Sequence, residues 1–306
     1  RTIDASNPMI DSRLKDGSRI NAVIPPLSVA GPVLTIRKFK DGMNSIEELI
    51  RLGTLTPEMA RFLSSAVIAR LNIIVSGSSG SGKTSLLNIL GSFIPNNERI
   101  ITIEDAAELN LDKEHVISLE TRNSNYNEEK DVTIRDLVIN SLRMRPDRII
   151  VGEVRGVEAF DMLQAMNTGH DGGMTTLHAN SPVDALNRLE SMVLMNGMEL
   201  PVKAIREYIN NAIDLIINID RMSDGKRKIT SIAEIQGIVD DRIVLKEIFA
   251  FNQTGLTATG EVMGEFIQYN FIPKCYEKIK ARGVKDVDDI FNYRFQINAL
   301  PKLNDK

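Results

Sequence analysis

The sequence has 306 residues, of which 42% are hydrophobic and 25% are charged, the composition of an ordinary soluble chain of about two domains. Its apolar runs are strand-sized and fall short of the roughly 18 residues that suggest a membrane span. The net charge of -4 argues against a nucleic-acid machine, and the single cysteine, Cys275, excludes an internal disulfide and a cysteine-rich zinc site. Because the first residue is Arg1 and not Met, we expect upstream sequence.

Residues 1–40 are predicted to form short strands and turns. The run 33–36 has the pattern of a strand, and several turn signals precede it: Asp16-Gly17, Pro25-Pro26 and Gly31-Pro32. We interpret 1–40 as the C-terminal part of a smaller N-terminal domain. A linker at 41–44, around Asp41-Gly42, follows it.

From residue 45 the pattern becomes that of an α/β domain, predicted over 45–250. Ser45 to Glu48 and Thr133 to Asp136 have the form of capping boxes, and Pro57 suits the first turn of a helix. Predicted strands alternate with helices, at 71–75, 99–103, 116–119, 148–151, 175–177 and 214–219. Such alternation indicates a mostly parallel sheet with helices on both faces. The segments 229–235 and 242–249 are predicted to form a terminal antiparallel pair, and 251–306 a mostly helical segment.

The run Gly77-Ser78-Ser79-Gly80-Ser81-Gly82-Lys83-Thr84 satisfies the G-x-x-x-x-G-K-[ST] pattern of a phosphate-binding loop. A buried strand precedes it and a helix follows, so its backbone N–H groups and the helix N-terminus face one anion. The predicted nucleotide-binding residues are Ser79, Gly80, Ser81, Gly82, Lys83, Thr84 and Ser85. Lys83 suits the β and γ phosphates, and the Thr84 hydroxyl suits Mg²⁺. The cofactors implied are ATP and Mg²⁺.

Two predicted strands end in acidic residues. The strand at 148–151 runs into Gly152-Glu153, and the strand at 99–103 runs into Glu104-Asp105. In a parallel sheet such groups lie at one edge, beside the phosphate loop. Glu153 is the candidate general base or water-orienting group. Glu104 is the candidate second carboxylate, which positions Mg²⁺, possibly through water, or the attacking water itself.

Three histidines are present, and His178 has the most informative position. It ends a predicted strand and precedes a capped helix, so it is a candidate to hydrogen-bond the γ-phosphate or the nearby water. His170 is a weaker candidate of the same kind, and His115 has no informative context. No set of ligands at zinc spacing accompanies them.

Four boxes therefore stand in one order, at 77–84, 101–110, 144–156 and 169–182. This order resembles the secretion ATPase superfamily of type II secretion, type IV secretion and type IV pili, and within it the CpaF/TadA-like Tad-pilus branch. The phrases that carry the resemblance are at 119–122, 142–156 and 163–172. It extends over about residues 10–275. Some extension motors of this superfamily carry a tetracysteine zinc insert, which a chain with one cysteine cannot form.

The resemblance implies a RecA-like ATPase core, a PAS-like N-terminal domain and a homohexamer with ATP between the two domains. It implies that Arg19 and Arg37 reach the phosphates, a task that the planar fork of arginine fits. It also implies a motor in the cytoplasm, peripheral at the inner membrane, that works on a platform protein of a pilus or secretion system. No nucleic-acid partner and no direct membrane span are expected.

Three other functions share the phosphate loop. A RecA-like nucleic-acid translocase or helicase should show basic loops with aromatic residues for stacking, but the chain has no Trp and 5% aromatics. A scaffold that binds ATP without hydrolysing it would not need Glu153. A small-molecule kinase would need an acceptor site, and none is apparent.

Overall fold

The computed structural model describes residues 2–38, 45–122, 130–197, 199–284 and 287–292. The chain divides into two compact units, Arg1–Asn44 and Ser45–Lys306. The linker predicted at 41–44 lies outside the described residues. None of the described helices has the length and apolar character needed to cross a membrane.

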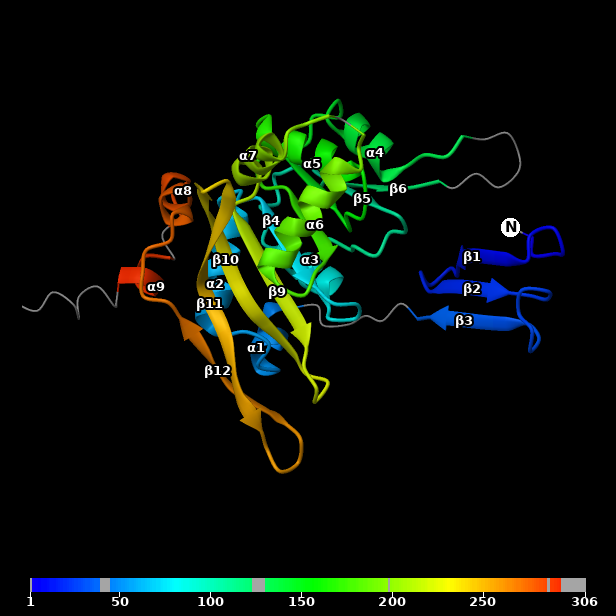
Figure 1. Cartoon of the computed structure of the whole chain (residues 1–306), viewed down its shortest axis with the longest axis horizontal. Coiled ribbons are helices and arrows are strands. Elements are labelled where there is room, and N and C mark those ends of the chain that lie inside the picture. The colour runs from blue at the N-terminus through cyan, green and yellow to red at the C-terminus, as the bar shows by residue number, and fades with distance from the viewer. Residues whose placement is uncertain (1, 39–44, 123–129, 198, 285–286, 293–306) are drawn as a thin grey trace, which may run out of the picture. The chain divides into compact units, whose positions relative to one another are not determined.

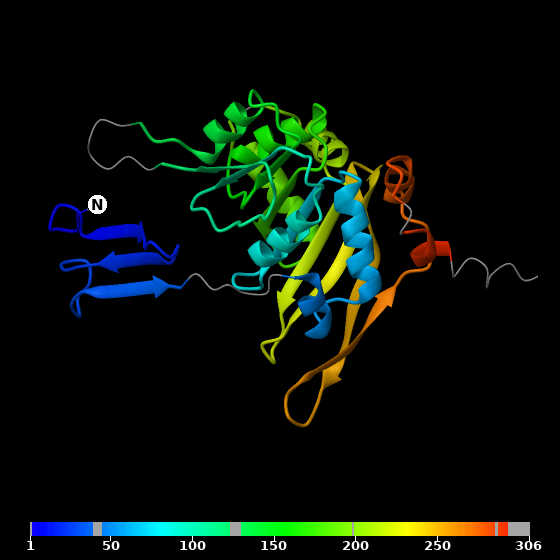
Figure 2. The ribbon, with the colours of Figure 1, turned by 180° about the vertical axis from the view of Figure 1, so that it is seen from behind.

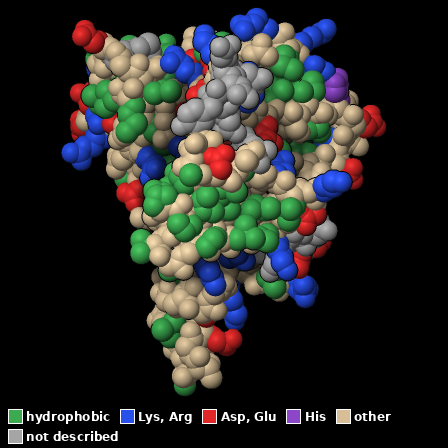
Figure 3. All heavy atoms as spheres, turned by 90° about the vertical axis from the view of Figure 1, so that its right-hand side faces the viewer, with side chains coloured by type: hydrophobic (Ala, Val, Ile, Leu, Met, Phe, Trp, Pro, Cys, Tyr) green, Lys and Arg blue, Asp and Glu red, His purple; other side chains and the backbone are tan. Residues whose placement is uncertain are grey.

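The first unit is a three-stranded antiparallel sheet. Its strands are β1 (Met9–Arg13), β2 (Arg19–Val23) and β3 (Val33–Arg37), in that spatial order. The turn signal Asp16-Gly17 joins β1 to β2, and the Asp16 carboxylate accepts a hydrogen bond from the backbone N–H of Ser18 at 2.9 Å. None of the described hydrophobic residues of this unit is buried, and hydrophobic side chains gather on the surface drawn in Figure 3.

The second unit is built on a nine-stranded sheet with the order β12-β11-β10-β9-β4-β8-β7-β5-β6 (Figure 1). The strands are β4 (Ile73–Gly77), β5 (Ile100–Glu104), β6 (Val116–Glu120), β7 (Arg148–Val151), β8 (Met174–His178), β9 (Leu215–Arg221), β10 (Arg227–Val239), β11 (Arg242–Leu256) and β12 (Val262–Gln268). Neighbours from β9 to β6 are parallel, and those from β9 to β12 are antiparallel. The predicted mostly parallel α/β sheet is therefore confirmed.

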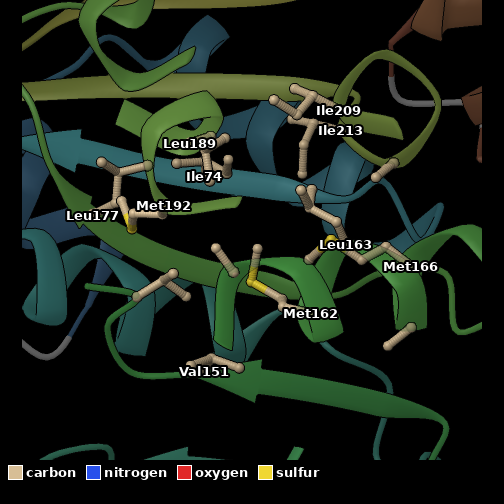
Figure 4. Close-up of a cluster of buried hydrophobic side chains, with 14 of the residues drawn as sticks. Ile74, Val151, Met162, Leu163, Met166, Leu177, Leu189, Met192, Ile209 and Ile213 are labelled. Atoms are coloured by element: carbon tan, nitrogen blue, oxygen red, sulfur yellow. The ribbon is translucent and has the colours of Figure 1, made fainter. Parts of the chain in front are cut away.

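Helices cover both faces of this sheet (Figures 1 and 2). They are α1 (Ile46–Arg51), α2 (Pro57–Ile68), α3 (Lys83–Ser92), α4 (Ile134–Ser141), α5 (Glu158–Asn167), α6 (Pro182–Leu194) and α7 (Val202–Ala212). On one face a core forms between the strands and helices α5, α6 and α7, where Ile74, Leu163, Leu189 and Ile209 are fully buried (Figure 4). On the other face, Phe62 of α2 packs against Phe249 of β11, with ring centroids 5.7 Å apart.

The prediction of a mostly helical segment over 251–306 is wrong for its first part. β11 continues to Leu256, and β12 follows it. Phe251 lies opposite Phe266 in the β11–β12 register, and their ring centroids are 5.1 Å apart. Aromatic pairs of this kind stabilise an antiparallel ladder, which explains why this stretch forms strands. The helices α8 (Cys275–Ala281) and α9 (Asp288–Asn292) come later, and 293–306 lie outside the described residues.

Helix α8 begins on a buried carboxylate of the sheet. Glu234 of β10 accepts hydrogen bonds from the backbone N–H groups of Lys274 at 3.0 Å and Cys275 at 3.1 Å. The Cys275 thiol is buried, and this burial, with the nearby charge of Glu234, raises its pKa well above the usual range. The backbone hydrogen bonds to Glu234 thus connect the start of α8 to β10 of the sheet.

Candidate functional site

The phosphate loop joins β4 in the middle of the sheet to α3. A side chain at Gly77 would put its Cβ 2.2 Å from the carbonyl oxygen of Ile219 and 2.5 Å from the Ser81 hydroxyl. Only glycine fits there, because the loop turns directly against β9. Inside the loop, the Lys83 ammonium donates a hydrogen bond to the carbonyl oxygen of Ser78 at 2.9 Å. The backbone of the loop therefore surrounds the Lys83 ammonium.

The predicted nucleotide-binding residues of this loop differ in exposure. Ser79, Gly80 and Ser85 are exposed, Gly82 and Thr84 are half-buried, and Ser81 and Lys83 are buried. The Ser81 hydroxyl oxygen is buried and has no hydrogen-bond partner in the described part of the chain. Burial also lowers the pKa of Lys83, although the charge of Glu153 acts in the opposite direction. A polyphosphate fits this loop, because it would accept hydrogen bonds from both buried donors.

The order of the strands places His178 between the loop and the acidic strand end. β8 pairs with β4 on one side and with β7 on the other, so its last residue lies between Lys83 and Glu153. Nδ1 of His178 is 3.3 Å from the Lys83 ammonium, and its Nε2 is 2.9 Å from the Glu153 carboxylate. The three predicted residues thus form one continuous series of polar contacts.

The donor inventory fixes the tautomer of His178 in this series. A lysine ammonium only donates, so Nδ1 must accept from Lys83, and the proton of a neutral ring must sit on Nε2, facing Glu153. Burial lowers the pKa of His178, and the positive charge of Lys83 adds to this effect, while Glu153 opposes it. The neutral ring is therefore the form that fits the site near neutral pH.

Arg155 is a residue of the site that the sequence reasoning did not single out. It donates to the Glu153 carboxylate at 2.6 Å and lies 3.6 Å from the carboxylate of Asp105. Its cation therefore connects the acidic ends of β7 and β5. The signal was present, since Arg155 falls within the run 142–156, two residues after the acid that closes the strand.

Glu104 lies at the end of β5 and is almost fully buried. Its carboxylate accepts hydrogen bonds from the backbone N–H groups of Glu108 at 2.9 Å and Leu109 at 3.1 Å. A Cβ at Gly152 would lie 2.6 Å from the Glu104 side chain, so the strand that carries Glu153 passes directly beside it. Glu104 thus supports the following loop in addition to any role toward a metal.

The structure brings Arg19 and Arg37 together within the first unit. They are opposite each other in the β2–β3 register, and Arg13 is opposite Arg19 in the β1–β2 register. Side chains at paired positions point to the same face of a sheet, so the three arginines form one row. The role of this row toward a nucleotide at Lys83 stays a prediction.

The described residues contain no group of three or more His, Cys, Asp or Glu that could hold a metal ion by itself. Mg²⁺ does not require such a group, since it is usually bound through one or two protein oxygens together with phosphates and water. The Thr84 hydroxyl at the start of α3 is of this kind, so the residues present fit Mg²⁺ that arrives with a nucleotide.

The central phosphate loop, the acidic strand ends and the strand order define a P-loop protein with a RecA-like α/β core. The family model described as "Type II/IV secretion system protein" matches residues 2–261. The chain is 36% identical to the conjugal transfer protein TrbB of Rhizobium radiobacter over 238 residues, 76% of this chain and 70% of the relative. The chain therefore belongs to the type II/IV secretion system protein family.

Two solved structures share the fold of this chain. The VirB11 ATPase of the Brucella suis type IV secretion system is 32% identical, with a TM-score of 0.52, over 76% of this chain and 78% of that one. The pilus retraction motor PilT with bound ADP has a TM-score of 0.53 over 97% of this chain and 76% of that one. Its identity of 20% supports the shared fold alone.

Proposed function

We propose that this chain hydrolyses ATP to ADP and phosphate and that the reaction powers a type IV pilus of the Tad-like kind or a related secretion system. The observation that carries the proposal is the contact series Lys83, His178 and Glu153. It connects the group that would hold the terminal phosphate with the group that would act on water. Membership in the type II/IV secretion system protein family and the similarity to the VirB11 ATPase support the same reaction.

Each residue of the series has a separate task in this proposal. Lys83 and the loop N–H groups hold the β and γ phosphates, and Thr84 holds Mg²⁺, which neutralises phosphate charge when bound. Glu153 accepts the proton of the attacking water, or orients that water, on the γ-phosphate side. His178 lies between Lys83 and Glu153, with Nε2 2.9 Å from the carboxylate, and so spaces the two charged groups. Arg155 keeps Glu153 at the carboxyl end of β7.

We further propose a homohexamer as the working form. The small sheet supports this, because its exposed hydrophobic residues offer a surface on which a partner subunit could pack. The ring would act in the cytoplasm, at the inner membrane, on a platform protein of the pilus or secretion system. Arg19 and Arg37 would close over the phosphates of ATP bound at Lys83.

The test compares phosphate release by the wild-type chain with release by Lys83→Ala and Glu153→Gln. Lys83→Ala should lose turnover and most nucleotide affinity, because hydrogen bonds to charged groups are worth about 1.5–3 kcal/mol each. Glu153→Gln should still bind ATP but turn over about 10²-fold more slowly, the scale of a lost acid–base group. Wild-type turnover in Lys83→Ala would refute the proposal.

Two further measurements separate this proposal from its rivals. Mass photometry with a non-hydrolysable ATP analogue should show hexamers, and a monomer at saturating nucleotide would contradict the ring. Addition of single-stranded DNA should leave the rate of phosphate release unchanged. Stimulation by DNA would instead favour the nucleic-acid translocase.

A further inference from the structure

The start of β10 lies directly against the phosphate loop. A Cβ built on Gly82 would lie 3.1 Å from Cδ and 3.2 Å from Nε of Arg227. The guanidinium of Arg227 also donates to the carbonyl oxygen of Gly80 at 3.4 Å. A cation from the antiparallel part of the sheet therefore reaches the loop from the side of β9, whereas Lys83 reaches it from within.

One nitrogen of the Arg227 guanidinium makes no hydrogen bond to the described residues. Nε of Arg227 is buried and has no hydrogen-bond partner among the residues that the structure describes. An unsatisfied buried N–H is costly, and more so on a charged group. The guanidinium as a whole lies beside Gly80 and Gly82, next to the start of α3, where a phosphate would bind.

A second arginine stands opposite the first. Arg221 of β9 pairs with Arg227 in the register, so the two side chains share one face of the sheet. The preceding pair on that face is Ile219 with Ile229, and Ile219 approaches Gly82 to 3.9 Å when a Cβ is built there. Like charges directly opposite each other destabilise a sheet. An anion bound next to them would remove this cost.

The turn between β9 and β10 is held in place from outside the loop. Asp224 accepts hydrogen bonds from the backbone N–H of Lys226 at 2.9 Å and of Val262 at 3.0 Å. The Lys226 ammonium lies 3.1 Å from the carboxylate of Glu261. The backbone hydrogen bonds to Asp224 tie the turn to the start of β12, at the same end of the sheet (Figures 1 and 2), whereas the exposed Lys226–Glu261 ion pair contributes little. Arg227 is thus positioned before any ligand arrives.

We propose that Arg227, with Arg221 beside it, is an additional phosphate-binding group for the nucleotide in this loop. The inference rests on the proposed function, since it assigns a further residue to the same site. Arg227 would donate from the outer nitrogens of its guanidinium to a non-bridging phosphate oxygen, a task that suits its planar fork, and Arg221 would add positive charge at longer range.

The test is the dissociation constant of Mg²⁺–ADP for the full chain, measured by calorimetry at low and high salt. Arg227→Gln should weaken binding by about tenfold or more, the effect of one lost charge-assisted hydrogen bond. Its affinity should also depend less on salt, because one cation has left the site. Arg221→Gln should weaken binding by about two- to threefold, as expected for a screened charge at longer range.

The matched control is Lys226→Gln. It removes one positive charge from the same turn, but Lys226 pairs with Glu261 and not with the loop, so the dissociation constant should stay as in the wild type. Arg227→Lys keeps the charge and loses the fork, so it should bind ADP several-fold more weakly. This variant decides the question if Arg227→Gln does not fold.

Three results would overturn the proposal. One is an Arg227→Gln dissociation constant equal to that of Lys226→Gln. Another is weaker binding with an unchanged salt dependence and a lower melting temperature of the nucleotide-free chain, which would make Arg227 a support for the loop only. The third result applies if Arg227→Gln does not fold: it is an Arg227→Lys variant that binds ADP with the wild-type dissociation constant. Failure of the wild-type chain to bind ADP would instead overturn the proposed function itself.

Discussion

The guanidinium of Arg155 donates to the Glu153 carboxylate at 2.6 Å, two residues along the same chain segment. The carboxylate is therefore held between Arg155 on one side and His178, at 2.9 Å, on the other. A carboxylate with neighbours on both sides is restrained in its orientation. If Glu153 acts on water as proposed, Arg155 is a positioning residue for it.

Arg155→Ala should lower the rate of ATP turnover by about three- to tenfold and leave ADP affinity unchanged. The effect is modest because the Arg155 side chain is 59% exposed, and exposed ion pairs contribute only about 0–1 kcal/mol. Arg155→Lys should recover part of the rate. Arg51→Ala, which removes an exposed ion pair in α1, is the control and should have no effect. An equal loss in both variants would show that Arg155 has no specific role.

His178 predicts the shape of the pH–rate profile. Its pKa is lowered, so the ring stays neutral through the range just below its ordinary value of about 6.5 and gains a proton only in more acidic solution. Protonation removes the acceptor for Lys83 and places two positive charges 3.3 Å apart. Turnover should therefore fall on the acidic side, as pH drops through the lowered pKa, and stay level above it.

Two amide variants separate the contacts of His178. The amide oxygen of His178→Asn can accept from Lys83, and the longer side chain of His178→Gln can place its amide NH₂ near Glu153, but neither amide titrates. Both should lose the fall in rate that comes from the imidazole, whereas His115→Gln, a change at an exposed histidine, should keep it. If the fall in turnover at acidic pH persists in both His178 variants, a group other than His178 causes it.

Glu104→Gln tests the second carboxylate. The amide oxygen can still accept from the backbone N–H groups of Glu108 and Leu109, so the melting temperature should change little. The half-saturating Mg²⁺ concentration for ATP turnover should rise several-fold, because a negative charge near the metal is lost. Glu104→Ala should in addition lower stability by about 1–3 kcal/mol, since it leaves buried N–H groups unpaired. If the half-saturating Mg²⁺ concentration is unchanged in Glu104→Gln, the role of Glu104 is limited to supporting the loop after β5.

Arg19→Ala and Arg37→Ala test the arginine row of the small sheet. Each should reduce turnover more than it reduces ADP affinity, because the predicted contact is with the γ-phosphate. Lysine should rescue only in part, since it lacks the planar fork. Lys15→Ala, in the exposed turn before β2, is the control. Unchanged turnover in both arginine variants would refute the clamp, and an equal loss of ADP affinity would place them on the α or β phosphate.

The sequence predicted the elements of the second unit well where short-range signals determine them. The capping box of Thr133 and Asp136 is present, and the strand predicted at 148–151 has the same bounds in the structure. The phosphate loop follows the end of β4 at Gly77 and leads into α3 at Lys83, as the motif predicts. These features depend on neighbouring residues, so they are visible in a linear pattern.

The order of the strands was not predictable in this way. β8 inserts between β4 and β7 although it follows both in the sequence, and this order places His178 against Lys83 and Glu153. Likewise, the strands at 251–268 depend on a cross-strand pair between Phe251 and Phe266. Arg227 approaches the loop across more than 140 residues of chain. Such relationships arise from long-range packing, on which local periodicity carries no information.

The buried thiol at the start of α8 can be used in labelling experiments. Cys275 is the only cysteine in the 306 residues, and its raised pKa keeps it protonated and poor as a nucleophile. Maleimide reagents should therefore react slowly with the folded chain and quickly once α8 leaves Glu234. A cysteine introduced on the surface could be labelled selectively for fluorescence without first removing the natural one. The rate of labelling at Cys275 would then report how often α8 separates from the sheet.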